Sequence, residues 1–184
     1  MLKINTLHFH LTDDNGWRLE IKKYPRLTEV GAWRVNRMDV PFYFRRNAEP
    51  GEPTPIGGFY TQEDIKEMVS YAADRQIEII PEIDMPAHSN AALAAYPQLA
   101  CPVVDSYIGV IPGLGGSNSG VIYCAGNDSA FTFLQDVLDE VMAIFPSRYI
   151  HLGGDEAQKG YWKKCPLCQQ RIKNCLLYTS PSPR

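Results

Sequence analysis

The stretch TQEDIKEMVSYAADRQIEIIPEID, residues 61–84, decides the fold that the sequence predicts. It opens at Thr61, and Asp64 three residues later completes a variant of the capping box that starts helices. The apolar residues that follow recur at helical spacing: Ile65, Met68, Val69, Ala72 and Ala73. Residues 77–83 are then a short apolar run bounded by polar sequence, which is typical of a buried strand. The unit is therefore a helix that leads within a few residues into a strand.

The same unit recurs on both sides of this stretch. Upstream, residues 4–12 alternate and are rich in β-branched, aromatic and leucine residues, which predicts a strand. Downstream, Asn127-Asp128-Ser129 offers caps for a second helix that stops before Pro146, and residues 148–152 form a third predicted strand. The order strand, helix, strand, helix, strand is typical of a parallel sheet.

The lengths of the connections favour a barrel over an open sheet. Those that leave the strands are long, spanning about residues 13–60 and 84–128, whereas those that enter the strands are short. This asymmetry is typical of a (β/α)₈ TIM barrel, whose loops after the strands carry the chemistry. A doubly wound open sheet would usually place a glycine-rich phosphate turn after its first strand, and the sequence has none there.

The chain is predicted to hold only part of such a barrel. A complete barrel needs roughly 250 residues and eight strands, and this α/β chain of 184 residues shows about three of the eight. We assign residues 1–174 to a partial catalytic barrel domain. Residues 175–184 are rich in Ser and Pro and are interpreted as a linker or as non-native sequence, so no functional inference rests on them.

The composition excludes some classes of partner. The formal net charge of -3 gives no basic footprint for nucleic acid. No apolar run reaches the roughly 18 residues that a membrane span needs. We interpret Met1 as an internal position of a longer protein, so the sequence start does not indicate the cellular location. The sequence does not indicate the oligomeric state either.

The five cysteines suggest no complete disulfide set, because their number is odd. Cys165-Pro-Leu-Cys168 is a CxxC pair that could be half of a zinc site or a redox pair. Zinc would need two further ligands, and Cys175 is the only close candidate along the sequence. We interpret the pair as thiols on a surface helix.

Polar residues collect where each of the three predicted strands ends, in residues 8–18, 82–88 and 151–156. The carboxyl ends of successive parallel strands converge on one mouth of a barrel, where barrel enzymes build their active sites. A single Asp at a strand end is usually a turn or cap residue. Three such clusters together predict a catalytic site.

Two chemistries fit this acidic mouth. His8 and His10 lie on one face of a strand and could hold a divalent ion in a metal-dependent hydrolase. We favour the other interpretation, two histidines hydrogen-bonded within a polar barrel interior, because only His88 and His151 remain as further histidine ligands. The other chemistry is glycoside hydrolysis, which needs a carboxylic acid and a second stabilising group. Trp17, Trp33 and Trp162 would suit sugar faces, or equally a core.

Three motifs resemble those of one family, glycoside hydrolase family 20, the β-N-acetylhexosaminidases. They are His-Leu-Gly-Gly-Asp-Glu-Ala at 151–157, His-Phe-His-Leu-Thr-Asp-Asp at 8–14 followed by Trp17-Arg18, and Pro-Glu-Ile-Asp-Met-Pro-Ala-His at 81–88. The resemblance spans nearly all of residues 1–174. It implies hydrolysis of terminal β-linked N-acetylhexosamine, GlcNAc or GalNAc, by a retaining mechanism in which the 2-acetamido group of the substrate attacks C1 and forms an oxazolinium ion.

The resemblance also implies roles for five residues. Glu156 would be the acid and base at the glycosidic bond, and Asp155 would hold the acetamido group. Asp13, Asp84 and His88 would support the acid. Strict strand alternation favours Asp14 over Asp13 for the face shared by His8 and His10, so the choice of Asp13 rests on the resemblance alone.

Further expectations follow from the family. The implied reaction needs no cofactor and no metal, its partner is a glycan with a terminal N-acetylhexosamine, and the implied location is secreted, periplasmic or lysosomal. Several strands that would complete the sugar pocket are absent, which predicts that the fragment alone is inactive. A degenerate carbohydrate-binding module is a further alternative, and the intact pair Asp155-Glu156 argues against it. The glycine-rich residues 109–120 are expected beside the mouth, as an aglycone contact or as a mobile loop.

Overall fold

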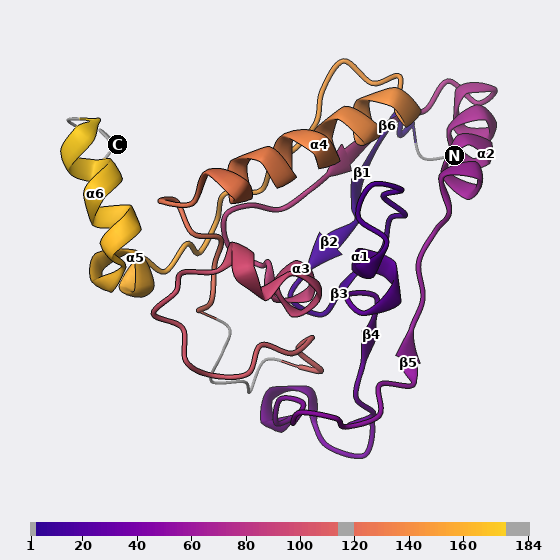
Figure 1. Cartoon of the computed structure of the whole chain (residues 1–184). Helices are drawn as coiled ribbons and strands as arrows, with labels where there is room; N and C mark the ends of the chain where they lie inside the picture. The colour runs from indigo at the N-terminus through magenta and orange to yellow at the C-terminus, as the bar shows by residue number, and fades with distance from the viewer. Residues whose placement is uncertain (1–2, 114–119, 176–184) are drawn as a thin grey trace.

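The computed structural model describes residues 3–113 and 120–175. At its centre, strands β1 (Thr6–His10) and β6 (Glu78–Glu82) pair in parallel. Thr6 faces Glu78 at one end of this pair and His10 faces Glu82 at the other. The two strands are far apart in sequence and lie side by side in Figure 1. This is the parallel pairing that the alternation of strands and helices predicts.

The third predicted strand is shorter than expected. Residues 148–152 make one parallel bridge, between His151 and Glu82, on the side of β6 that faces away from β1. The Ile83 N–H donates to the His151 carbonyl at 3.0 Å, and the His151 N–H donates to the Pro81 carbonyl at 2.9 Å. Within the described residues this segment has a neighbour on one edge only, so its pairing is limited to the few residues before Gly153.

Both predicted helices are confirmed. Helix α2 (Gln62–Ala73) begins after Thr61, which forms a reciprocal capping box with Asp64. Helix α4 (Asp128–Ile144) begins after Asn127, whose side chain accepts from the Ser129 N–H. In Figure 1, α4 runs beside the paired strands and α2 lies next to β6. Each helix returns the chain to the next strand through a short connection, as the sequence predicts.

The long connections carry short elements that the sequence does not indicate. The connection from β1 to α2 contains β2 (Thr12–Asp13), β3 (Gly16–Trp17), α1 (Arg26–Glu29), β4 (Trp33–Arg34), the 3-10 turn η1 (Phe42–Phe44) and β5 (Ile56–Gly57). The later ones contain α3 (Asn90–Ala95), the 3-10 turn η2 (Pro97–Leu99), α5 (Gly160–Lys164) and α6 (Pro166–Asn174). Helix α3 is almost wholly buried, so it has no polar face from which a helical period could be read.

The core lies between α4 and the loops that follow the strands. Trp17 is only 1% exposed, and its indole N–H donates to the Leu19 carbonyl at 2.6 Å. Leu11, Phe133 and Val137 are packed into the same cluster. Trp17 is therefore a core residue and not a platform for a sugar ring.

The C-terminal boundary is only partly visible. Helix α6 ends at Asn174, and the exposed Cys175 is its C-cap. Residues 176–184 lie outside the described residues, so the assignment of 175–184 as a linker or non-native tail stays a prediction.

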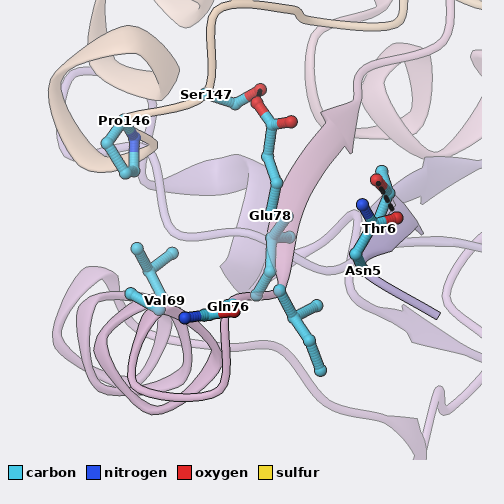
Figure 2. A pocket seen from close by; sticks show the side chains of 10 residues that line it. Asn5, Thr6, Val69, Gln76, Glu78, Pro146 and Ser147 are labelled. Carbon is cyan, nitrogen blue, oxygen red and sulfur yellow. Dashed lines mark hydrogen bonds between the residues drawn. The ribbon is translucent and has the colours of Figure 1, made fainter. Parts of the chain in front are cut away.

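The two ends of the sheet differ in chemistry. At the amino ends of β1 and β6 lies a cavity of about 400 Å³, shown in Figure 2. Glu78 accepts a hydrogen bond there from the Ser147 hydroxyl at 2.8 Å, and Asn5, Thr6 and Gln76 lie around it. Because barrel enzymes place their chemistry at the carboxyl ends of the strands, this cavity is not the candidate active site.

Candidate active site

His88 lies at the centre of the acidic cluster at the carboxyl ends of the strands. Its Nδ1 atom is 3.3 Å from Asp13 Oδ1 and 3.5 Å from Asp14 Oδ2. Its Nε2 atom is 3.4 Å from Glu156 Oε2 and 3.7 Å from Asp155 Oδ2. One imidazole ring therefore lies between the carboxylates that follow β1 and the adjacent pair that follows the third strand segment.

Burial differs sharply across this cluster. The side chains of Asp155 and Glu156 are 67% and 78% exposed, so both can reach a ligand from solvent. The Nε2 atom of His88 is buried and makes no hydrogen bond within the described residues. Its contacts with the two exposed carboxylates are therefore electrostatic rather than directional in this conformation.

Asp84 is a buried carboxylate close to the exposed residues Asp155 and Glu156. It is 4% exposed, and its own N–H donates to the Thr12 hydroxyl at 2.8 Å. Its carboxylate accepts from the Gly154 N–H at 3.4 Å and comes within 4.8 Å of ligand atoms of His88 and Asp155. Asp84 thereby ties the end of β6 to the turn that carries Asp155 and Glu156.

Two non-glycine residues of the cluster adopt the left-handed backbone conformation. His88 and Glu156 both have a φ of 48°, and Gly153 and Gly154 beside them have φ values of 66° and 100°. Left-handed backbone is unfavourable for residues with a Cβ and is concentrated at functional sites. The turn at 153–156 is what directs two adjacent carboxylates toward one mouth.

The charges of the cluster are strongly coupled. Burial alone would lower the pKa of His88, but the carboxylates of Asp14, Asp13, Asp84 and Asp155 outweigh it and raise that pKa. Burial raises the pKa of Asp84, against the hydrogen bond from Gly154. The carboxylates around His88 therefore favour its imidazolium form.

Asp14 is expected to make stability depend on pH. Burial raises its pKa from the ordinary 3.8 to about 6. Between these values the folded chain holds a proton that the unfolded chain has released, so the free energy of unfolding falls as pH rises from about 4 to 6. In Asp14→Asn this fall is smaller, by at most about 3 kcal/mol, the equivalent of roughly two pKa units. Urea unfolding of both proteins at pH 4.5 and pH 7 measures it, and parallel pH dependence in the two would contradict the prediction.

Gly153 is the one position of the turn where a side chain has no room. A Cβ there would overlap the carboxylate of Asp84, and the φ of 66° disfavours any L side chain. We expect Gly153→Ala to lower the free energy of unfolding by about 2 to 4 kcal/mol, since it combines left-handed strain with displacement of a buried charge. Gly160→Ala is the matched control, because a Cβ at Gly160 meets nothing within 4 Å. Equal denaturant midpoints for the two variants would show that Gly153 is replaceable.

A cavity of about 170 Å³ opens beside this cluster. Its walls include Asp13, Asp14, His88 and Glu156, together with Ile111 and Gly113 from the glycine-rich loop. The loop is fastened there, because the Ile111 N–H donates to the Asp14 carbonyl at 3.0 Å and the Asn15 amide donates to the Ile111 carbonyl at 2.6 Å. The described part of residues 109–120 thus borders the mouth as expected, and residues 114–119 lie outside the described residues.

The two histidines of β1 do not form a shared metal site in this structure. The Nε2 atom of His8 is 2.6 Å from Glu82 Oε2, and the Nδ1 atom of His151 is 2.9 Å from Glu82 Oε1. Among the described residues, the clusters with metal-ligand spacing place His8 with His151 but His10 with Asp84. Glu82 therefore contacts both His8 and His151. The metal-dependent alternative, which needs His8 and His10 to share an ion, is not favoured.

Two acidic residues of the site have no role among those that the resemblance implies. Glu82 lies in the polar cluster at the end of the second predicted strand, and alternation along β6 places it on the same face as Asp84. Asp14 reaches His88 as Asp13 does, and the N–H of Asn90 donates to the buried Asp14 at 3.0 Å. The alternation that pointed to Asp14 was a usable signal in the sequence.

Comparison with known proteins identifies the family of this chain. The model of the glycosyl hydrolase family 20 catalytic domain matches residues 1–180. The chain belongs to glycosyl hydrolase family 20. It is 50% identical over 174 residues to a β-hexosaminidase of Porphyromonas gingivalis, covering 95% of this chain and 20% of that protein.

Solved family 20 structures give the same result for the fold. A β-N-acetylhexosaminidase of Bacteroides fragilis superposes with a TM-score of 0.72 at 46% identity, over 96% of this chain and 30% of that one. An exo β-N-acetylglucosaminidase of Vibrio harveyi, solved in complex with N-acetylglucosamine, gives 0.73 at 38% identity, over 96% and 26%. The chain spans about a fifth to three tenths of these relatives. Because family 20 structures contain a TIM barrel, β1, β6 and the segment at His151 are part of one.

Proposed function

We propose that this family 20 chain carries the catalytic pair of an exo-acting β-N-acetylhexosaminidase, which removes terminal β-linked GlcNAc or GalNAc from glycans. The observation that supports this most directly is the convergence of Asp155 and Glu156 on His88, at the carboxyl ends of parallel strands. The relatives named as hexosaminidases, and the Vibrio harveyi enzyme solved with N-acetylglucosamine, support the choice of substrate.

Glu156 is the acid and base of the proposed reaction. In the first step its proton passes to the glycosidic oxygen, while the carbonyl oxygen of the 2-acetamido group attacks C1 and the aglycone leaves as an alcohol. In the second step the Glu156 carboxylate takes a proton from water, whose oxygen opens the oxazolinium at C1. Two displacements at C1 retain the β configuration, and no carboxylate of the enzyme attacks the sugar.

Asp155 acts on the acetamido group. As a carboxylate it accepts the hydrogen bond of the acetamido N–H and offsets the positive charge that develops as the ring closes. Adjacent residues can serve different parts of one substrate because the left-handed turn at Gly153, Gly154 and Glu156 separates their directions. The high exposure of both side chains leaves them available to the substrate.

Asp13, Asp84 and His88 are positioning residues in this proposal. His88 in its imidazolium form faces both catalytic carboxylates and is itself held by Asp13 and Asp14. Asp84 supports the turn from below through Gly154. These residues therefore surround the inner side of Glu156 with charged groups, while its side chain stays open to solvent and to substrate.

The whole protein's setting is also proposed. Its partner is a glycan or oligosaccharide with a terminal N-acetylhexosamine, it needs no cofactor, and it acts in a secreted, periplasmic or lysosomal location. No helix among the described residues is long and apolar enough to cross a membrane. Because the chain spans only part of its relatives, the fragment by itself is proposed to be inactive, and activity belongs to a full-length protein that carries it.

The test compares two aryl glycosides in a full-length protein that carries this sequence. An aryl β-N-acetylglucosaminide should be hydrolysed, whereas the matching aryl β-glucoside, which lacks the assisting acetamido group, should not. A short treatment with a chelator, which removes a catalytic ion from an open site but not an ion enclosed in the fold, should leave activity unchanged. Hydrolysis of both glycosides at similar rates would exclude substrate assistance, and loss of activity in the short treatment would favour a metal-dependent hydrolase.

A further inference from the structure

Four of the five cysteines gather in one buried cluster away from the catalytic carboxylates. Cys101 and Cys124 come from the long connection between β6 and α4, whereas Cys165 and Cys168 lie at the start of α6. All four are at most 2% exposed. The interpretation of the CxxC pair as thiols on a surface helix is therefore wrong, and Cys175, the expected third ligand, is exposed and outside the cluster.

The distances between the sulfur atoms fit a shared metal ion. The Sγ atom of Cys168 is 3.7 Å from that of Cys101 and 3.6 Å from that of Cys124, and Cys124 is 3.8 Å from Cys165. All four sulfurs lie within 4.8 Å of one another. A tetrahedral zinc ion with Zn–S bonds of about 2.3 Å separates its four sulfurs by about 3.8 Å. The three sulfur–sulfur distances of 3.6, 3.7 and 3.8 Å match this spacing, and the whole set is compact enough to surround one ion.

A pair of disulfides fits these distances less well. A disulfide joins sulfurs at about 2.05 Å, in exclusive pairs. Here Cys168 and Cys124 each have two sulfur neighbours at nearly equal distance, and no pair stands apart from the others. Four sulfurs that all lie within 4.8 Å of one another fit a central ion better than two separate disulfides.

The backbone around the cluster holds the ligands in place. The Cys124 N–H donates to the Leu99 carbonyl at 2.9 Å, and Ala100 forms an antiparallel bridge with Tyr123, so Cys101 and Cys124 follow from paired backbone. On the other side, Cys165 is the N-cap of α6 and Cys168 lies in its first turn. This is the CxxC spacing of zinc sites.

The surroundings of the cluster close it to solvent. A Cβ at Gly126 would overlap the backbone of Leu167 and Cys168, so the loop after Cys124 lies directly against α6. Trp162 packs on the cluster, and its indole N–H donates to the Tyr123 carbonyl at 2.8 Å. Four protein ligands in a dry site leave no open position for water or substrate, which is the mark of a structural zinc.

We propose that Cys101, Cys124, Cys165 and Cys168 hold a structural zinc ion that fastens α5 and α6 to the connection between β6 and α4. Helix α5 begins at Gly160, only four residues after Glu156. The zinc therefore holds the chain that follows the turn with Asp155 and Glu156, while Asp84 holds the start of that turn through Gly154. This inference does not depend on the proposed glycosidase activity.

Metal content tests the proposal directly. A full-length protein that carries this sequence is purified with a reducing agent, loaded with zinc, dialysed and analysed by elemental mass spectrometry. We expect Cys124→Ser and Cys168→Ser to contain one zinc equivalent fewer than the wild type. Cys175→Ser, which removes an exposed thiol of the same chemistry, should retain the full content. In the cobalt-loaded wild type, absorption of tetrahedral thiolate coordination should appear, and it should be missing in Cys124→Ser.

Measurements on the unmodified protein keep the proposal falsifiable where a variant fails to fold. Bound zinc should protect four thiols from an aromatic disulfide reagent, and a strong chelator should expose them. Four thiols that react equally with and without zinc would overturn the proposal. So would disulfides among these four residues in peptide mass spectrometry, or iron in place of zinc after loading with both metals.

Discussion

We expect the replacement of Glu156 by glutamine to lower kcat/KM toward an alkyl β-N-acetylglucosaminide by about 10²- to 10⁴-fold, the usual contribution of a positioned general acid. Glutamine keeps the shape of the side chain and its place beside His88 but has no proton to give to an alkoxide leaving group. The loss should be much smaller for a dinitrophenyl glycoside, because that leaving group departs without protonation. Initial rates for the two substrates, in a full-length protein that carries this sequence, measure the difference.

Glu67→Gln is the matched control for this substitution. Glu67 lies on the exposed face of α2, so the same chemical change there should leave both rates unaltered. An equal loss of rate for both leaving groups would assign Glu156 to folding or binding rather than to proton transfer. Full activity toward the alkyl glycoside would remove Glu156 from the mechanism.

Replacing Asp155 by asparagine should lower kcat by about 10²- to 10³-fold, the typical loss on removing one group that stabilises transition-state charge. The variant loses the anion that faces the developing oxazolinium, and its amide can turn a donor toward the acetamido N–H. A cyclic thiazoline analogue of the intermediate should also bind more weakly. Inhibition constants for this analogue and kcat for an aryl glycoside give the two readouts.

The two catalytic variants should differ in these readouts. Glu156→Gln should keep most of its affinity for the thiazoline, because it leaves the acetamido partner intact, whereas Asp155→Asn should lose it. Asp74→Asn, at the exposed end of α2, is the control for the loss of one carboxylate. An Asp155→Asn enzyme with the wild-type rate would rule out the assisted mechanism proposed for this chain.

The helices were predictable because their signals are local. The cap at Thr61 and Asp64 and the apolar stripe of α2 both lie within residues 61–73, and the structure confirms the helix and its capping box. The third strand was predicted too long, because pairing needs a neighbour that the sequence does not name. Helix α3 was missed because a buried helix has no alternation of polar and apolar faces.

The residues of the candidate site could be predicted from the sequence, but the contacts between them could not. Because parallel strands end at one mouth of a barrel, the residues that follow them could be predicted to lie close together. These residues are Asp13, Asp84, His88, Asp155 and Glu156. The sequence could not show that His88 is the residue between them, since that depends on left-handed backbone at residue 88. Nor could it show that Glu82 joins His8 and His151, because that contact crosses three strand segments.

The sequence by itself determined the family, the alternation of helices and strands, and the identity of the adjacent carboxylates, because each is written in contiguous motifs. Only the tertiary structure decided how the carboxylates share a histidine, that Asp14 is buried, and that the CxxC pair meets two distant cysteines. These three features depend on the paths of the long connections. The path of a long connection is determined by the packing of the whole domain and not by a local sequence motif. The stretch at 61–84 predicted the order of helices and strands, whereas the folding of the loops after the strands placed the functional side chains.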